Sequence, residues 1–256
     1  MPTKMPALFL GHGSPMNAIE DNAWRRSWLA LGERLPRPRA IVCISAHWET
    51  KGIAVTAAAR PDMIYDFYGF PQALFDVRYP APGDPALARR IAQLLAPAPV
   101  ELDLVRGFDH GAWSVLVAMY PKADIPVVQL SMPLNLTPEA HYELAKRLAP
   151  LREEGVLILG SGNLVHNLRY WRSHEPQMAA SWTRFNDAVK RHIAAGNHAA
   201  VAAYTKLDAE ALLSVPSPEH YLPLLYVLAV QGADETVEIF NDTDGGAIFM
   251  TSVQIG

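Results

Sequence analysis

The chain has 256 residues, half of them hydrophobic and 19% of them charged. Its formal net charge of −4 excludes the strongly basic surface typical of nucleic-acid binding and gives no attraction to anionic membranes. The longest apolar runs are far shorter than the roughly 20 residues that cross a bilayer, and no secretory leader is recognisable. We therefore expect a cytoplasmic protein with no nucleic-acid or membrane partner. The single cysteine, Cys43, cannot form an intrachain disulfide, and its apolar surroundings predict a core position.

Short apolar runs rich in β-branched residues alternate with amphipathic stretches along the chain. Strands are predicted at residues 7–10, 40–45, 53–56, 127–130, 156–159, 236–240 and 247–253. Helices are predicted at residues 85–95, 138–148, 178–194 and 218–230, with capping and proline signals at several of their ends. The alternation predicts an α/β fold, with one domain over residues 1–256 and a central sheet covered by helices on both faces. The turn Asn241–Gly246 predicts a terminal hairpin, which makes the sheet mixed.

The segment Arg60–Tyr79 is rich in aromatic residues and has no clear periodicity. Its aromatic residues are Tyr65, Phe67, Tyr68, Phe70, Phe75 and Tyr79. Irregular segments of this length inside compact domains are usually functional. This segment is expected either to line a substrate site or to pack against the core.

Three of the nine histidines directly follow predicted strands. His12 follows the first strand, His47 the second, and His166 the strand at 156–159. Because ligands bind at the carboxyl ends of the strands in open α/β sheets, these imidazoles are expected to converge. Imidazole is a suitable ligand for Zn(II) and Fe(II), so the sequence predicts a metal site at this edge of the sheet.

Two further histidines lie in distinctive surroundings. His110 lies in a predicted glycine-flanked turn, and His220 in the first turn of the last predicted helix. Glu49 and Asp109 are candidates for hydrogen-bonding an imidazole and fixing its tautomer. The remaining histidines are expected at the surface; they are His141, His174, His192 and His198.

Five motifs occur in order along the chain. They are Gly11-His12-Gly13-Ser14-Pro15, Ser45-Ala46-His47-Trp48, Phe108-Asp109-His110-Gly111-Ala112-Trp113, Gly160 to Leu168 around His166, and Pro218 to Leu224 around His220. Together they resemble the DODA-type extradiol aromatic ring-opening dioxygenases, a branch of the class III extradiol dioxygenase superfamily. The resemblance implies one metal ion per chain, Fe(II) or Zn(II), and O2-dependent cleavage of a catechol ring.

The resemblance also implies roles for individual residues. His12, His47 and His220 match metal ligands, His166 matches either a fourth ligand or a catalytic acid and base, and His110 matches a catalytic histidine facing the substrate. Class III enzymes typically use a glutamate where this chain has His220, although Glu219 is adjacent. A neutral imidazole in place of a carboxylate makes the centre more positive and favours Zn(II), whereas ligation by Glu219 would favour Fe(II).

The expected function is therefore 4,5-cleavage of a catechol such as DOPA by O2. The expected partners are a small catecholic substrate and O2, and the protein is expected to be a monomer or a small homo-oligomer. Two alternatives remain open: a zinc-dependent hydrolase using the same histidine cluster, and a non-catalytic metal-binding protein. A serine hydrolase is disfavoured because neither Ser14 nor Ser161 lies in a Gly-x-Ser-x-Gly motif.

Overall fold

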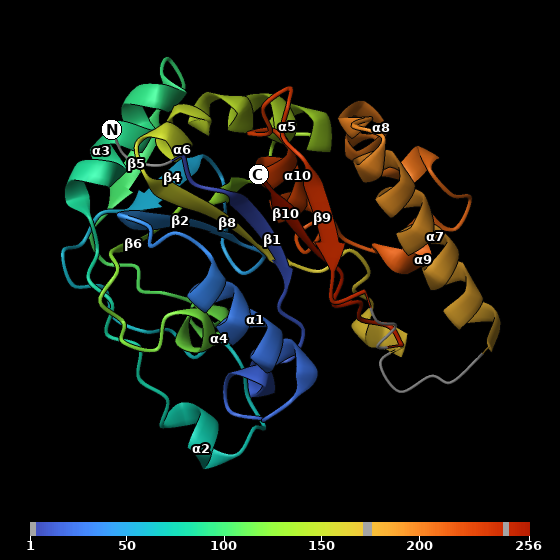
Figure 1. The fold of residues 1–256 in the computed structure, drawn as a ribbon, viewed down its shortest axis with the longest axis horizontal. Coiled ribbons are helices and arrows are strands. Elements are labelled where there is room, and N and C mark those ends of the chain that lie inside the picture. The colour runs from blue at the N-terminus through green and yellow to red at the C-terminus, as the bar shows by residue number, and fades with distance from the viewer. Residues whose placement is uncertain (1–3, 171–175, 243–245) are drawn as a thin grey trace.

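A six-stranded sheet forms the centre of the computed structural model, which describes residues 4–170, 176–242 and 246–256 (Figure 1). The strand order is β6-β2-β8-β1-β10-β9. These strands span Val127–Gln129 (β6), Ala40–Ser45 (β2), Val156–Gly162 (β8), Ala7–Gly11 (β1), Ser252–Ile255 (β10) and Val237–Phe240 (β9). The first four are parallel, and β10 is antiparallel to both of its neighbours, so the predicted mixed sheet is confirmed.

Two small parallel sheets lie beside the central one. One pairs β3 (Glu49–Thr50) with β7 (Met132–Pro133), and the other pairs β4 (Ile53–Thr56) with β5 (Val100–Asp103). The α-helices are α1 (Ala23–Arg34), α2 (Gln72–Phe75), α3 (Pro85–Leu95), α4 (His110–Met119), α5 (Pro138–Ala145), α6 (Pro150–Glu153), α7 (Pro176–Ala194), α8 (His198–Ala202), α9 (Ala211–Ser214) and α10 (Leu222–Leu228). The 3-10 turns are η1 (Pro15–Ala18), η2 (Lys146–Leu148), η3 (Leu168–Tyr170) and η4 (Tyr204–Lys206). Within the described ranges, no helix is both long enough and apolar enough to cross a membrane.

Both faces of the central sheet are buried, because successive side chains of a strand point to opposite faces. Leu8 and Cys43 face the core formed with α1 and α4, whereas Phe9 and Val42 face the core formed with α5 and α10. Figure 1 shows these two pairs of helices on opposite sides of the sheet. The expected α/β arrangement and the buried position of Cys43 are both confirmed.

Local capping signals place several helix ends where the sequence predicts them. The Asp84 carboxylate accepts hydrogen bonds from two N–H groups in the first turn of α3, and Pro85 occupies the first helical position. Thr137 caps α5 in the same way through the N–H of Ala140. Helix α7 ends before Gly196, whose φ of +67° suits glycine.

Two boundaries near the site differ from the prediction. Helix α10 begins at Leu222, so His220 lies in the turn before the helix rather than inside it. The antiparallel pairing of β9 with β10 is confirmed, but β10 begins at Ser252. The chain before β10 bonds instead to the loop around His166: Asn167 N–H donates to the Ala247 carbonyl at 2.9 Å, and Phe249 N–H to the Val165 carbonyl at 3.1 Å. Part of the predicted hairpin turn, residues 243–245, lies outside the described residues.

Candidate metal and substrate site

The carboxyl ends of three neighbouring strands bring His12 and His47 together. Strands β1 and β2 lie on either side of β8 in parallel register, with Gly11 opposite Gly162 and Ser45 opposite Ser161. His12 is the first residue after β1 and His47 the second after β2. Their Nε2 atoms lie 3.2 Å apart. The predicted convergence of these two rings is therefore present.

His220 joins them from a different direction, because the turn before α10 packs directly on β8. The Asn163 N–H donates to the His220 carbonyl at 2.9 Å. A Cβ on Gly162 would lie only 2.1 Å from that carbonyl oxygen, so this close approach requires glycine. Gly162 thus allows the turn to place the His220 ring beside the other two.

The rings of His12, His47 and His220 form a nearly equilateral triangle, which we call the three-histidine group. Their centroid separations are 5.1, 5.1 and 5.2 Å. Each ring offers a nitrogen within 4.8 Å of the others. With nitrogen–metal bonds of about 2.1 Å, nitrogens 3.2 Å apart subtend roughly 100° at a shared ion. The donor set and its spacing fit one divalent transition-metal ion.

A hydrogen-bond chain fixes the tautomer of His12. The Ser161 hydroxyl donates to the Gly111 carbonyl at 2.5 Å, so its oxygen accepts from His12 Nδ1–H at 2.9 Å. With Nδ1 protonated, the Nε2 lone pair of His12 is free and faces His47.

Asp66 has a comparable position beside His47 and His110. Its Oδ2 lies 3.4 Å from His47 Nδ1, and its Oδ1 lies 2.9 Å from His110 Nδ1. Oδ1 also accepts the His110 backbone N–H at 2.9 Å. Burial raises the pKa of Asp66, but the hydrogen bonds and charge of His110 outweigh it and lower this pKa to about 2. Asp66 is therefore an anion that orients both rings.

His12, His47, His166 and His220 are neutral near pH 7. Burial, followed by the charges of neighbouring histidines, holds the pKa values of His12 and His220 well below their ordinary range. Burial and the charges of His47 and His110 lower the pKa of His166 to about 4. Burial and His110 also lower the pKa of His47 to about 4, although the carboxylates of Asp109 and Asp66 act in the opposite direction. Neutral imidazole is the form that binds metal ions. In addition, His220 Nδ1 is buried and has no hydrogen-bond partner among the described residues, which fits a nitrogen that binds a metal ion.

His166 lies against the three-histidine group without pointing into it. Its ring stacks on that of His220, with centroids 3.5 Å apart and planes 7° apart. Lone pairs in the planes of parallel rings do not converge on a single point. His166 is also near Glu219, whose Oε1 accepts from the Ser217 hydroxyl at 2.9 Å.

His110 begins helix α4 rather than lying in an irregular turn, because Asp109 caps that helix through the N–H of Ala112. The His110 ring contacts that of His47, at a centroid distance of 4.0 Å. The capping carboxylate is completely buried and accepts four hydrogen bonds, donated by the Ser45 hydroxyl, the Ala112 N–H, Arg106 and the Gln129 amide.

The predicted role of Asp109 in orienting an imidazole is wrong, because other donors occupy its oxygens. Glu49 is an exposed side chain and makes no hydrogen bond to an imidazole within the described chain. Ser161 and Asp66 perform this role instead. The sequence offers Ser161 only as a possible nucleophile, and it marks Asp66 by nothing beyond its place in the aromatic segment.

The aromatic segment both packs on the core and contacts the site. Phe67 contacts the His110 ring edge-on at 5.5 Å, and it also packs against Trp113 and Phe75. Tyr68, by contrast, is 92% exposed. Core packing is therefore confirmed for Phe67, whereas a role of this segment in lining a substrate site stays a prediction.

The remaining histidines lie away from the three-histidine group. His141 is buried and bonded through Nδ1 to the Tyr226 hydroxyl at 2.9 Å, so the predicted surface position is wrong. His198 is half-buried and bonds to the Tyr142 hydroxyl at 3.0 Å, and His192 is half-buried near Asn197. His174 lies outside the described residues.

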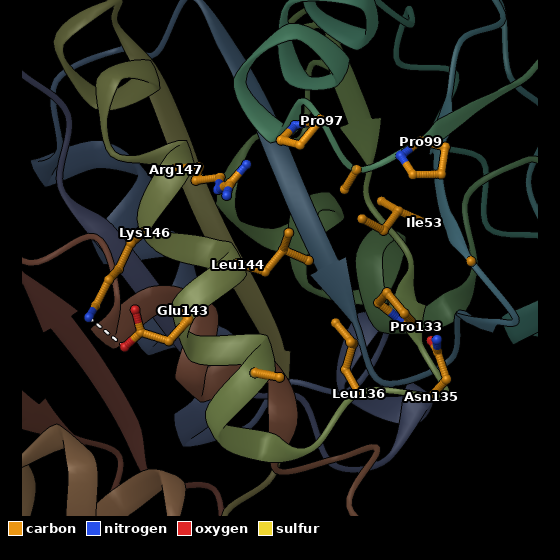
Figure 2. A pocket seen from close by; sticks show the side chains of 13 residues that line it. Ile53, Pro97, Pro99, Pro133, Asn135, Leu136, Glu143, Leu144, Lys146 and Arg147 are labelled. Carbon is orange, nitrogen blue, oxygen red and sulfur yellow. Dashed lines mark hydrogen bonds and ion pairs between the residues drawn. The ribbon is translucent and has the colours of Figure 1, made fainter.

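Two cavities are candidates for a substrate site. A cavity of about 770 Å³ lies between α5 and the β4 region, with an apolar lining that includes Ile53 and Leu144 (Figure 2). The charged side chains at its rim already have partners, because Lys146 pairs with Glu143 at 2.6 Å and Arg147 donates to backbone carbonyls. A second cavity, of about 370 Å³, is lined by His166 and Glu219 but by no member of the three-histidine group.

Comparisons with known proteins agree on one family. Residues 6–244 match the family described as the catalytic LigB subunit of aromatic ring-opening dioxygenase. The chain is 52% identical to a 4,5-DOPA dioxygenase extradiol of Escherichia coli K12, over 99% of this chain and 96% of the relative. It is 40% identical to a protein of the same name from Beta vulgaris, over 93% and 91% of the two chains. A crystal structure of an uncharacterized Escherichia coli K12 protein superposes with a TM-score of 0.84 at 46% identity, covering 98% of this chain and all of that one.

Proposed function

From the membership of this chain in the LigB family of aromatic ring-opening dioxygenases, we propose that it opens a small catechol such as DOPA by 4,5-cleavage. Extradiol ring cleavage is the activity of the family, and the match covers nearly the whole chain. We extend the catalytic domain to residues 1–256, since β10 at the carboxyl end is hydrogen-bonded to β1 in the central sheet. The observation that carries the proposal is the three-histidine group at the carboxyl ends of β1 and β2.

We assign metal binding to His12, His47 and His220. Glu219 is the weaker candidate for the third ligand, because it groups with His166 and His220 but not with His12 and His47. In this site a divalent ion would supply Lewis acidity toward the catechol hydroxyls and, as Fe(II), the means of reacting with O2. Three neutral nitrogen ligands also favour Zn(II), so the metal that the protein retains and the metal that supports turnover need not be the same.

We assign proton transfer to His166 and orientation of the substrate to His110. The His166 ring is neutral near pH 7 and can accept a proton from a catechol hydroxyl. Its parallel stacking on His220 argues against a fourth ligand at the same ion. The His110 ring contacts the rings of His47 and Phe67, and its Nδ1 lies 2.9 Å from Asp66 Oδ1. A catechol ring between His110 and His166 would have a hydrogen-bonding imidazole on each side.

Oxygen uptake tests the activity directly. Protein reconstituted anaerobically with Fe(II) is mixed with L-DOPA or caffeate, and we expect one O2 consumed per catechol with formation of a yellow ring-opened semialdehyde. The variant His220→Ala should lose at least about 100-fold in rate, because a ligand is removed. If no catechol in a broad panel consumes O2, the proposed activity is wrong. Turnover of esters or amides by the zinc-loaded protein without O2 would instead support the hydrolase alternative.

A further inference from the structure

His47 lies in a turn outside the central sheet, so the strand ladder does not fix its backbone. Strand β2 ends at Ser45, and His47 is the second residue of the turn that follows. Its N–H donates to Ser45 Oγ at 3.2 Å, and its carbonyl accepts from Arg106 Nη2 at 3.1 Å. Both polar backbone groups of this proposed metal ligand are therefore held by side chains.

The Arg106 guanidinium is itself fixed by several neighbouring groups. It lies over the Trp48 ring, with Cζ 4.7 Å from the ring centroid. The Nη2 that bonds to the His47 carbonyl also donates to Asp109 Oδ2 at 3.1 Å. The Arg106 backbone N–H donates to Asp103 Oδ1 at 2.8 Å, at the end of β5. Because Trp48 is buried and directly follows His47, the stacked guanidinium restrains the turn as well as the carbonyl.

The carboxylate of Asp109 connects this arginine to helix α4. Asp109 caps α4 by accepting the Ala112 N–H, and His110 is the first residue of that helix. Asp109 Oδ1 also accepts from the Ser45 hydroxyl at 2.6 Å, and Ser45 Oγ accepts the His47 N–H. The N–H and the carbonyl of His47 are thus each linked to Asp109 through one side chain. One connected network therefore joins the backbone of His47 to the helix that carries His110, whose ring lies 4.0 Å from that of His47 by centroid distance.

We propose that Arg106 is a positioning residue that holds His47 in its place in the three-histidine group and at its distance from His110. A planar guanidinium can stack on Trp48 while one of its nitrogens bonds to the His47 carbonyl and to Asp109, an arrangement that a lysine ammonium does not reproduce. Arg106 acts through the backbone of His47. The proposal rests on the proposed function, because it takes His47 as a metal ligand.

Metal binding tests the proposal without turnover. Competition with a chromophoric chelator gives the Kd for Zn(II), and the visible absorption spectrum of Co(II)-loaded protein reports the geometry of the ligands in the folded state. Arg106→Met removes every donor, so we expect the Zn(II) Kd to rise about tenfold and the Co(II) spectrum to change. Arg106→Lys keeps the charge beside Asp109 but not the planar group, so we expect the Kd to rise about threefold.

The matched control is Arg147→Met. Arg147 also donates to backbone carbonyls, those of Leu95 and Ala96 at the end of α3, and none of its hydrogen bonds within the described chain reaches the three-histidine group. This variant should keep the wild-type Kd and Co(II) spectrum. An equal change in Arg147→Met and Arg106→Met would overturn the proposal, because a general loss of packing would then explain both.

Wild-type affinity and spectrum in Arg106→Met would also overturn the positioning role. If that variant does not fold, Arg106→Lys decides alone, and wild-type values in it would have the same meaning. Failure of the underlying function has a different signature. An Fe(II) enzyme that consumes no O2, in a protein whose Zn(II) affinity depends on Arg106, would refute ring cleavage and leave the role of Arg106 in place.

Discussion

At the scale of single residues, Ser161 leaves Nε2 of His12 free by accepting from its Nδ1–H, and Asp66 lies 3.4 Å from Nδ1 of His47. Ser161 is 149 positions from His12 in sequence, and Asp66 lies in a segment without periodicity. The histidines could be proposed as a group because each strand end is a local signal and strand ends meet in a sheet. Their hydrogen-bond partners could not, because those bonds depend on loop conformations that no local pattern specifies.

Removing the charge of Asp66 should weaken the site. In Asp66→Asn, the amide cannot serve as an anionic acceptor for both His47 and His110, so we expect metal affinity to fall about 10- to 100-fold. Competition for Zn(II) with a chromophoric chelator measures this. Asp62→Asn, an exposed carboxylate of the same segment, serves as the control and should bind Zn(II) like wild type. Equal affinity in Asp66→Asn and wild type would contradict the orienting role.

Removing the Ser161 hydroxyl should release His12 to either tautomer. We expect Ser161→Ala to lose about tenfold in Zn(II) affinity, since the ligand nitrogen is no longer preselected. Ser114→Ala is the matched control, because Ser114 is equally buried and its hydroxyl has no partner among the described residues. A loss of the same size in both variants would show that the effect comes from packing.

At the scale of elements, the helices with capping signals were predictable and the helix that carries His110 was not. Asp84-Pro85 and Thr137-Pro138 mark α3 and α5 because cap and proline act within one turn. Helix α4 is buried and apolar nearly all round, so it has little amphipathic pattern, and its glycine suggested a turn. The approach of His220 to β8 likewise depends on tertiary packing at Gly162.

Asp109 is expected to stabilise α4 far more than an ordinary helix cap. Asp109→Ala leaves buried donors without an acceptor, including Arg106 and Gln129, so we expect a loss of about 3 kcal/mol in the free energy of unfolding. Asp84→Ala, which removes a less buried cap from α3, should cost about 1 kcal/mol. Urea denaturation measures both. Equal losses would show that Asp109 acts only as a cap.

At the scale of the whole molecule, the buried histidines make stability depend on pH. Burial lowers the pKa values of His47, His141 and His166 to about 4, whereas an unfolded histidine titrates near its ordinary value. Below about pH 6.5 the unfolded chain binds protons that the folded chain does not, so stability is lost as the pH falls toward 4. The lowered pKa of Asp66 acts in the same direction, but only below its ordinary range, so it contributes nothing between pH 6.5 and about 4.

We therefore expect metal-free protein to lose at least about 2 kcal/mol in the free energy of unfolding between pH 7.5 and pH 5. Urea denaturation at the two pH values gives this difference. Stability that is constant or rises over this range would contradict the neutral, buried state of these histidines.

The central claim is that His12, His47 and His220 hold one metal ion at the edge of the sheet. Two competing groups exist among the described residues, His47-Asp66-His110 and His166-Glu219-His220. Anomalous diffraction from crystals of protein loaded with Zn(II), recorded on both sides of the zinc absorption edge, distinguishes the three. We predict one strong peak per chain, within bonding distance of all three rings of the three-histidine group. A peak at either competing group, or none near His12, would contradict this account.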